Sequence, residues 1–273
     1  MILCSSTRLL SAALLTFSLM FLPEGFSSSA HPPSHSVAAS SGPPAKAPSP
    51  IPAGTIIPVS WEHTVSASDA QPGQPVEARV MQDVPLPHRD KIPAKAKVFG
   101  TIVSVVPPAN GIGGKITFRF DKIEFHNTTI PVSVSLRTMA PYLDIQTAQT
   151  PVSGYDQFSG WATTVQIGGD IRYGDGGDVR NRQKQKVGKG VPGGVLVHIA
   201  ANPAFGCEGP ASGNDQLQAL WVFSSASCGV YDMSGVQIAH SGATAPLGDV
   251  TVTKDKETLK IEGSTAMLLR VIQ

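Results

Sequence analysis

Glycine and proline recur so densely along this chain that long helices have little room. The 273 residues include 27 Gly and 23 Pro, and both residues destabilise helix interiors. Between these breaks lie short segments rich in valine, isoleucine and threonine, which favour strands. The pattern predicts an all-β protein built as a small barrel or sandwich.

Strands are expected in two sections of the chain. The segment 115–120 shows the clearest pattern, because Ile116, Phe118 and Phe120 alternate with polar residues, as in a half-buried strand. The predicted strands are 55–61, 76–82, 97–106, 115–120 and 129–136 in the first section, and 195–200, 219–224, 236–240, 249–253, 258–262 and 267–272 in the last. We expect a first β-domain over 51–138 and a second over 191–273. The pattern leaves open whether they form one continuous fold.

A short motif occurs twice in the first section. Ile51-Pro52-Ala53 and Ile92-Pro93-Ala94 each lead into a predicted strand. A proline at the start of a strand has no amide to donate, so it does not interrupt a ladder. We interpret the two copies as a structural device and not as a repeat array.

Residues 139–190 are expected to form a loop-rich connection that carries a basic segment. A strand is possible within 161–167, and the Gly- and Asp-rich stretch 168–178 is typical of loops. The run 174–178 slightly resembles a calcium-binding turn, but it is a single copy, and a flexible loop is the favoured interpretation. No metal or cofactor is expected.

The first thirty residues have the pattern of an export signal. Arg8 precedes an apolar run of about 14 residues, and small residues precede a cut after Ala30. A bilayer-spanning helix needs roughly 20 apolar residues, so a retained anchor is the weaker alternative. Residues 31–50 are rich in Pro, Ser and Ala, which predicts a disordered tether. We therefore expect an exported, periplasmic or cell-surface protein with no transmembrane segment after cleavage of residues 1–30.

The cysteine count agrees with export. Cys4 lies within the signal, so Cys207 and Cys228 remain as an even pair in an oxidising compartment. A disulfide between them would close a loop of about 20 residues and stabilise the second β-domain by about 3 kcal/mol. Two buried free thiols are the alternative.

The charge of the chain does not indicate a globally basic nucleic-acid binder, because the formal net charge is only +1. One local cluster stands out, with Asn and Gln but no acid between its members: Arg180, Arg182, Lys184, Lys186 and Lys189. Such a cluster can attract an anionic glycan or lipid surface. The residues between the cations are not aromatic, so base stacking on nucleic acid is not indicated. A solvated loop is the alternative.

Part of the first section resembles a known family. The stretches AGTIIPVSWE at 53–62, SDAQPGQPVEARVMQDV at 68–84 and IPAKAKVFGTIVSV at 92–105 are similar, in the same order, to the C-terminal β-barrel domain of the TrbI-like family. Proteins of that family form the outer core of conjugation and type IV secretion machines. The resemblance covers about residues 51–136 and implies a barrel fold and a place in the cell envelope.

No catalytic constellation is apparent. The chain lacks a G-x-S-x-G motif, and its seven histidines are scattered. The acids cannot be paired from their spacing alone, which is the reason to keep an exported hydrolase as a third hypothesis. We expect a non-enzymatic envelope protein that contacts other envelope proteins through strand edges or apolar loops within 137–165. The alternative is an exported binding module for an anionic glycan or polymer that uses the basic cluster.

Overall fold

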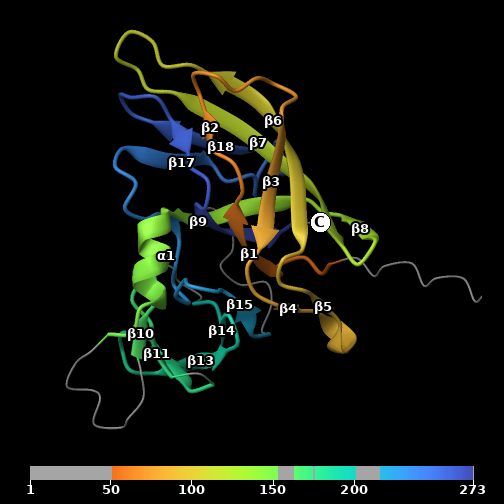
Figure 1. Ribbon diagram of the computed structural model, residues 1–273, viewed down its shortest axis with the longest axis vertical. Coiled ribbons are helices and arrows are strands. Elements are labelled where there is room, and N and C mark those ends of the chain that lie inside the picture. The colour runs from red at the N-terminus through yellow and green to blue at the C-terminus, as the bar shows by residue number, and fades with distance from the viewer. Residues whose placement is uncertain (1–50, 153–162, 175, 201–215, 273) are drawn as a thin grey trace, which may run out of the picture. The chain divides into compact units, whose positions relative to one another are not determined.

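The protein is mostly β with one short helix among the residues that the structure describes, as the sequence predicts for its class. The structure is a computed structural model that describes residues 51–152, 163–174, 176–200 and 216–272. Its main feature is a nearly closed barrel (Figure 1). The barrel strands, in spatial order, are β16 (Gly229–Val230), β9 (Val134–Ala140), β20 (Ala266–Val271), β1 (Ile56–Trp61), β3 (Pro75–Val80), β6 (Lys97–Val106), β7 (Lys115–Phe125), β18 (Val250–Lys254) and β17 (Val236–His240). A further strand, β8 (Thr128–Pro131), pairs with β7.

The barrel is filled by apolar side chains that alternate inward along its strands. At the centre, the rings of Trp61, Phe118 and Phe120 meet edge to face, with centroids 5.1 to 5.8 Å apart. Near the gap in the barrel, the amide of Leu136 on β9 donates to the carbonyl of Ser241, just after β17, at 2.8 Å. This bond links the two sides of the gap.

The first and last sections of the chain build this barrel together. Strand β20 lies between β1 and β9, and β18 pairs with β7, with Val250 opposite Phe118. The section 191–273, where a second β-domain was expected, therefore does not form a sheet of its own, and its described strands are divided among the barrel, the six-stranded sheet and the pair β2–β19. The physical reason is that strands β1, β7 and β9 each need a partner that the first section does not supply.

A separate six-stranded antiparallel sheet follows chain order as a series of hairpins. Its strands are β10 (Thr163–Val165), β11 (Ile171–Tyr173), β12 (Asp178–Arg180), β13 (Lys186–Val191), β14 (Gly194–Val197) and β15 (Gln218–Ala219). The helix α1 (Tyr142–Gln149) precedes it. Residues 139–190, expected to be loop-rich, thus contain a helix and four strands. The predicted strand at 219–224 is largely a buried turn instead.

Several short elements complete the fold. They are β2 (Val65–Ser66), which pairs with β19 (Lys260–Ile261), β4 (Val84–Pro85), which pairs with β5 (Lys91–Ile92), and the 3₁₀ turn η1 (Pro87–Arg89). The predicted strand at 258–262 is reduced to β19, and the one at 129–136 is divided between β8 and β9.

The two Ile-Pro-Ala motifs form the same turn. In each, the amide three residues after the proline donates to the proline carbonyl at 3.2 Å, from Thr55 in the first and Ala96 in the second. The residue between has a positive φ, 85° at Gly54 and 72° at Lys95, as a type II turn requires. The motif is therefore a turn that starts a strand, as the sequence indicates.

A second apolar core joins the six-stranded sheet and α1 to the outside of the barrel. Ile56 and Leu268 of the barrel pack there with Ile145 of α1 and with residues 220–223. Two buried glutamines add polar links: the side-chain oxygen of Gln218 accepts from the Ile56 amide at 3.0 Å, and Gln82 bonds to backbone groups of both the β14 strand and the turn after β15. All described residues belong to one compact unit, Ala47–Gln273.

Candidate functional site

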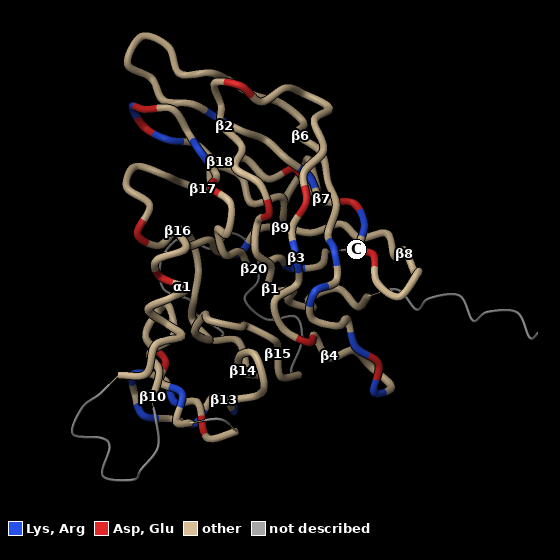
Figure 2. Tube along the Cα trace, in the orientation of Figure 1, with Lys and Arg blue, Asp and Glu red and all other residues tan. Residues whose placement is uncertain are grey.

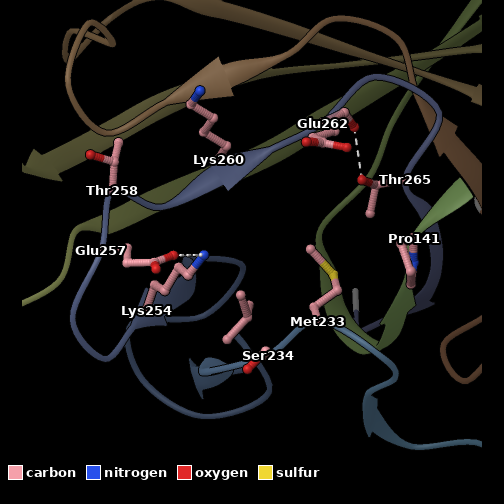
Figure 3. A pocket seen from close by; sticks show the side chains of 10 residues that line it. Pro141, Met233, Ser234, Lys254, Glu257, Thr258, Lys260, Glu262 and Thr265 are labelled. Atoms are coloured by element: carbon pink, nitrogen blue, oxygen red, sulfur yellow. Dashed lines mark hydrogen bonds and ion pairs between the residues drawn. The ribbon is translucent and has the colours of Figure 1, made fainter.

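An open groove lies between the end of β18 and the short strand β19. It has a volume of about 530 Å³ and is lined by Pro141, Met233, Ser234, Val236, Lys254, Glu257, Thr258, Lys260, Glu262 and Thr265. Figure 3 shows Lys254 and Glu257 turned toward each other, and their charged atoms are 2.7 Å apart. The hydrogen bond from Lys254 lowers the pKa of Glu257. Glu257 is therefore held ionised, and the groove offers a paired charge to a polar ligand.

A second cavity, of about 620 Å³, lies where the barrel meets the six-stranded sheet. Its lining is Pro52, Ala53, Thr55, Pro85, Leu86, Pro87, Lys189, Leu196, Gln216, Leu217 and Gln218. Its lining includes three prolines and three leucines, and Lys189 supplies a positive charge. Lys189 lies on β13 opposite Asp178, away from the turn that joins β12 to β13. The other cations of the predicted basic cluster lie at or next to that turn.

Helix α1 presents the most distinctive exposed surface for a protein partner. Two apolar side chains at its start are open to water, Leu143 at 70 % and Tyr142 at 50 % exposure. The side-chain Nε2 of Gln146 donates to the Tyr142 hydroxyl at 3.0 Å, one turn earlier in the helix. Among the described residues of α1, no exposed position carries a charged side chain, because Asp144 is partly buried. The acidic segment that Figure 2 shows on α1 corresponds to Asp144 in its first turn.

This surface lies within the segment 137–165, where the sequence predicts apolar contacts. We call it the α1 face and define it by Tyr142, Leu143, Gln146, Thr147 and Gln149, all exposed. Val152 and Val165, beyond the helix, are also more than 40 % exposed. A surface that lacks charge and carries an ordered tyrosine has the composition typical of an interface core.

The basic cluster forms the hairpin of β12 and β13. Asp178 at the start of β12 bonds to Arg180 at 2.8 Å and to Lys186 at 2.7 Å, and these bonds lower the pKa of Asp178. Arg182 and Lys184 lie in the turn between the strands, and no described carboxylate pairs with either. In Figure 2 the Lys and Arg segments gather beside β13. The structure thus brings four predicted cations together, and two of them, Arg180 and Lys186, share the single negative charge of Asp178.

The sequence did not predict a buried cluster of polar side chains at 224–227. The hydroxyls of Ser224 and Ser227 lie 3.1 Å apart, and Ser227 donates to the Ile167 carbonyl at 2.6 Å. The amide of Ser225 donates to the buried carboxylate of Asp170 at 2.7 Å. These bonds fix the turn after β15, and the only sequence signal for them is the run Ser-Ser-Ala-Ser. The cluster is structural in character.

The predicted disulfide, export signal and tether involve residues that the structure does not describe. Cys228 is buried, but Cys207 lies in the undescribed segment 201–215, so the disulfide stays a prediction. The export signal predicted at 1–30 and the tether predicted at 31–50 also lie outside the described residues, so both stay predictions. Within the described ranges, no group of three His, Cys, Asp or Glu side chains is placed to hold a metal ion. No described helix is both long and apolar enough to cross a membrane.

Comparisons with known proteins add no assignment. None of the family models, curated proteins or solved structures compared with the chain matches it.

Proposed function

We propose that the protein is an exported, non-enzymatic interaction module of the cell envelope. It contacts other envelope proteins in a periplasmic or surface assembly, and the α1 face is the contact surface. The proposal includes a TrbI-like barrel, a proline-rich tether and a disulfide between Cys207 and Cys228.

The observation that carries this proposal is the exposure of Tyr142 and Leu143 on a helix face without charge. Only Ile145 and Ala148 of α1 are buried, so Leu143 is not needed to attach the helix to the protein. Exposed aromatic and leucine side chains are typical of surfaces that a partner covers. The export signal and the TrbI-like segments support an envelope location for this partner.

Leu143→Glu tests the contact. The glutamate would lie in the first turn of α1, where a negative charge favours the helix, so the fold should be retained. In a complex, the carboxylate would be buried without a counter-ion, which weakens binding by about tenfold or more. We expect the wild-type protein to sediment from envelope extracts as a large complex and the variant to sediment as a smaller species.

Leu247→Glu is the matched control, because Leu247 is also exposed, at 45 %, but lies in the loop before β18. It should sediment like the wild type. The proposal fails if wild-type protein is a free monomer in these extracts, or if the Leu143→Glu protein remains in the complex.

A second candidate function rests on the β12–β13 hairpin. Arg182 and Lys184 extend its turn without a described carboxylate partner, and this arrangement suits the binding of an anionic glycan, polymer or lipid surface. On this proposal the interaction is electrostatic and weakens as salt is added.

Neutralising Arg182 and Lys184 together, with glutamine at both positions, should strongly reduce salt-sensitive retention on a heparin column. The matched control is the pair Lys95→Gln and Lys256→Gln, which removes the same charge from two exposed sites elsewhere. Both pairs include one lysine with positive φ, 62° at Lys184 and 72° at Lys95. Equal loss of retention in the two double variants would contradict a specific site on the hairpin.

A further inference from the structure

Arg137 occupies an irregular position in the barrel. Strand β9 pairs with β20 so that Leu136 faces Leu269 and Thr138 faces Leu268, which leaves Arg137 as the extra residue of a β-bulge. Bulges redirect side chains and are common beside functional sites.

The bulge lies beside a second arginine. Ala266 and Leu268 of β20 point into the core outside the barrel, whereas Met267 and Leu269 point inward. By this alternation Arg270 lies on the outer side of the barrel. Tyr231, which packs against the outer core, lies close enough to Arg137 to affect its ionisation.

Arg137 is largely buried at one end of its guanidinium, and no described carboxylate forms an ion pair with it. Its Nη2 atom is inaccessible to solvent and has no hydrogen-bond partner. Burial and the nearby charge of Arg270 lower the pKa of Arg137 to about 10, while Tyr231 raises it. The group is therefore still charged at neutral pH, and the charge of Arg270, which acts on it, has the same sign.

Such an arrangement is unfavourable without an anion. Buried charges in proteins are normally paired or hydrogen-bonded, and a guanidinium offers a planar fork of donors that fits oxygen anions. A bound anion would fill the unused donor of Arg137 and reduce its repulsion from Arg270.

We propose that Arg137 is the principal donor of a binding site for an oxygen anion, located at the β9 bulge on the outer side of the barrel. The ligand carries a phosphate, sulfate or carboxylate group. Arg270 contributes positive potential, and the Tyr231 hydroxyl borders the site. This site is separate from the α1 face and from the β12–β13 hairpin.

The test measures the thermal unfolding midpoint of the full-length exported protein while phosphate, sulfate or acetate replaces chloride at constant ionic strength. At about ten times the dissociation constant, a bound anion should raise the midpoint by about 3–5 °C, and the rise should saturate. Comparing the three anions distinguishes a phosphate or sulfate group from a carboxylate as the preferred ligand.

Arg137→Met removes the charge and keeps an unbranched apolar side chain. We expect it to abolish the rise and, in chloride alone, to be at least as stable as the wild type, because an unneutralised buried charge is removed. Arg89→Met, at an exposed arginine of η1, should respond like the wild type. If Arg137→Met does not fold, Arg137→Lys, which lacks the planar fork, should show a weaker response at every anion concentration.

Three results would overturn the proposal. One is the absence of a saturable rise with any of the anions in the wild type. Another is an equal rise in the wild type and the Arg137 variant. The third is a loss of several degrees by Arg137→Met in chloride alone, which would show that a group of the chain itself already neutralises Arg137.

Discussion

Replacing Gln82 with leucine is expected to lower the free energy of unfolding by about 3–5 kcal/mol. The side-chain oxygen of Gln82 accepts from the amides of Trp221 at 2.7 Å and Val195 at 3.3 Å, and its nitrogen donates to the Val195 carbonyl at 2.8 Å. Leucine has a similar size but no polar atom, so the amides of Trp221 and Val195 would remain buried and unpaired, and the Val195 carbonyl would keep only its 3.2 Å bond from the Leu220 amide. Each such group costs about 1–3 kcal/mol, less what relaxation recovers.

Urea unfolding followed by circular dichroism measures this loss, and hydrogen exchange locates it. The amides of Val195 and Trp221 should lose more protection than amides inside the barrel, because Gln82 joins the barrel to the second sheet. Gln237→Leu is the control, since Gln237 is an exposed residue of β17, and its effect should stay within about 0.5 kcal/mol. Equal effects of the two substitutions would show that the Gln82 bonds contribute little.

The importance of Gln82 is not visible in the sequence. It is the last residue of a predicted strand, and its partners follow more than a hundred positions later, at the start of β14 and after β15. Periodicity identifies which residues of a strand face a core, but it carries no information on which distant backbone groups a buried amide will meet. The same limit explains why β18 was not expected to pair with β7.

Strands with long apolar alternation were predicted well, and short ones were not. The bounds of β6 and β17 agree with prediction. Strands β10, β11 and β12 have three residues each, too few for a period to show. Most of β13 lies in the section expected to be loop-rich, but it is a strand in which a Cβ on Gly188 would lie 2.1 Å from the Leu196 carbonyl oxygen. Gly188 is thus required by the close approach of β14.

The candidate sites were predicted in part. The five cations were recognised as a cluster, but the ion pair of Asp178 with Lys186 depends on the pairing of β12 with β13. Helix α1 was missed because it has only eight residues and two buried side chains, too little for a helical period. Arg137 could not be singled out, since a bulge arises from the register between two strands and not from either sequence alone.

Phe118→Ala should destabilise the barrel by about 3–5 kcal/mol, the range found when a buried phenylalanine is truncated. Phe118 is fully buried, and its ring contacts Trp61 and Phe120 edge to face, at 5.1 and 5.7 Å between centroids. Its backbone lies in the middle of β7, between Ile102 of β6 and Val250 of β18. Removing the ring therefore leaves a cavity where strands from both ends of the chain meet.

Phe99→Ala provides a control with the same change of side chain. Phe99 is only partly buried, and its ring lies 4.9 Å from the Lys122 ammonium and 5.8 Å from that of Lys97, so its loss should cost about 1 kcal/mol. Urea unfolding gives both values. Because one barrel contains both sections of the chain, Phe118→Ala should shift the whole transition to lower urea without dividing it. A cost no larger than that of Phe99→Ala, or a transition in two steps, would contradict a single core centred on the three aromatic rings.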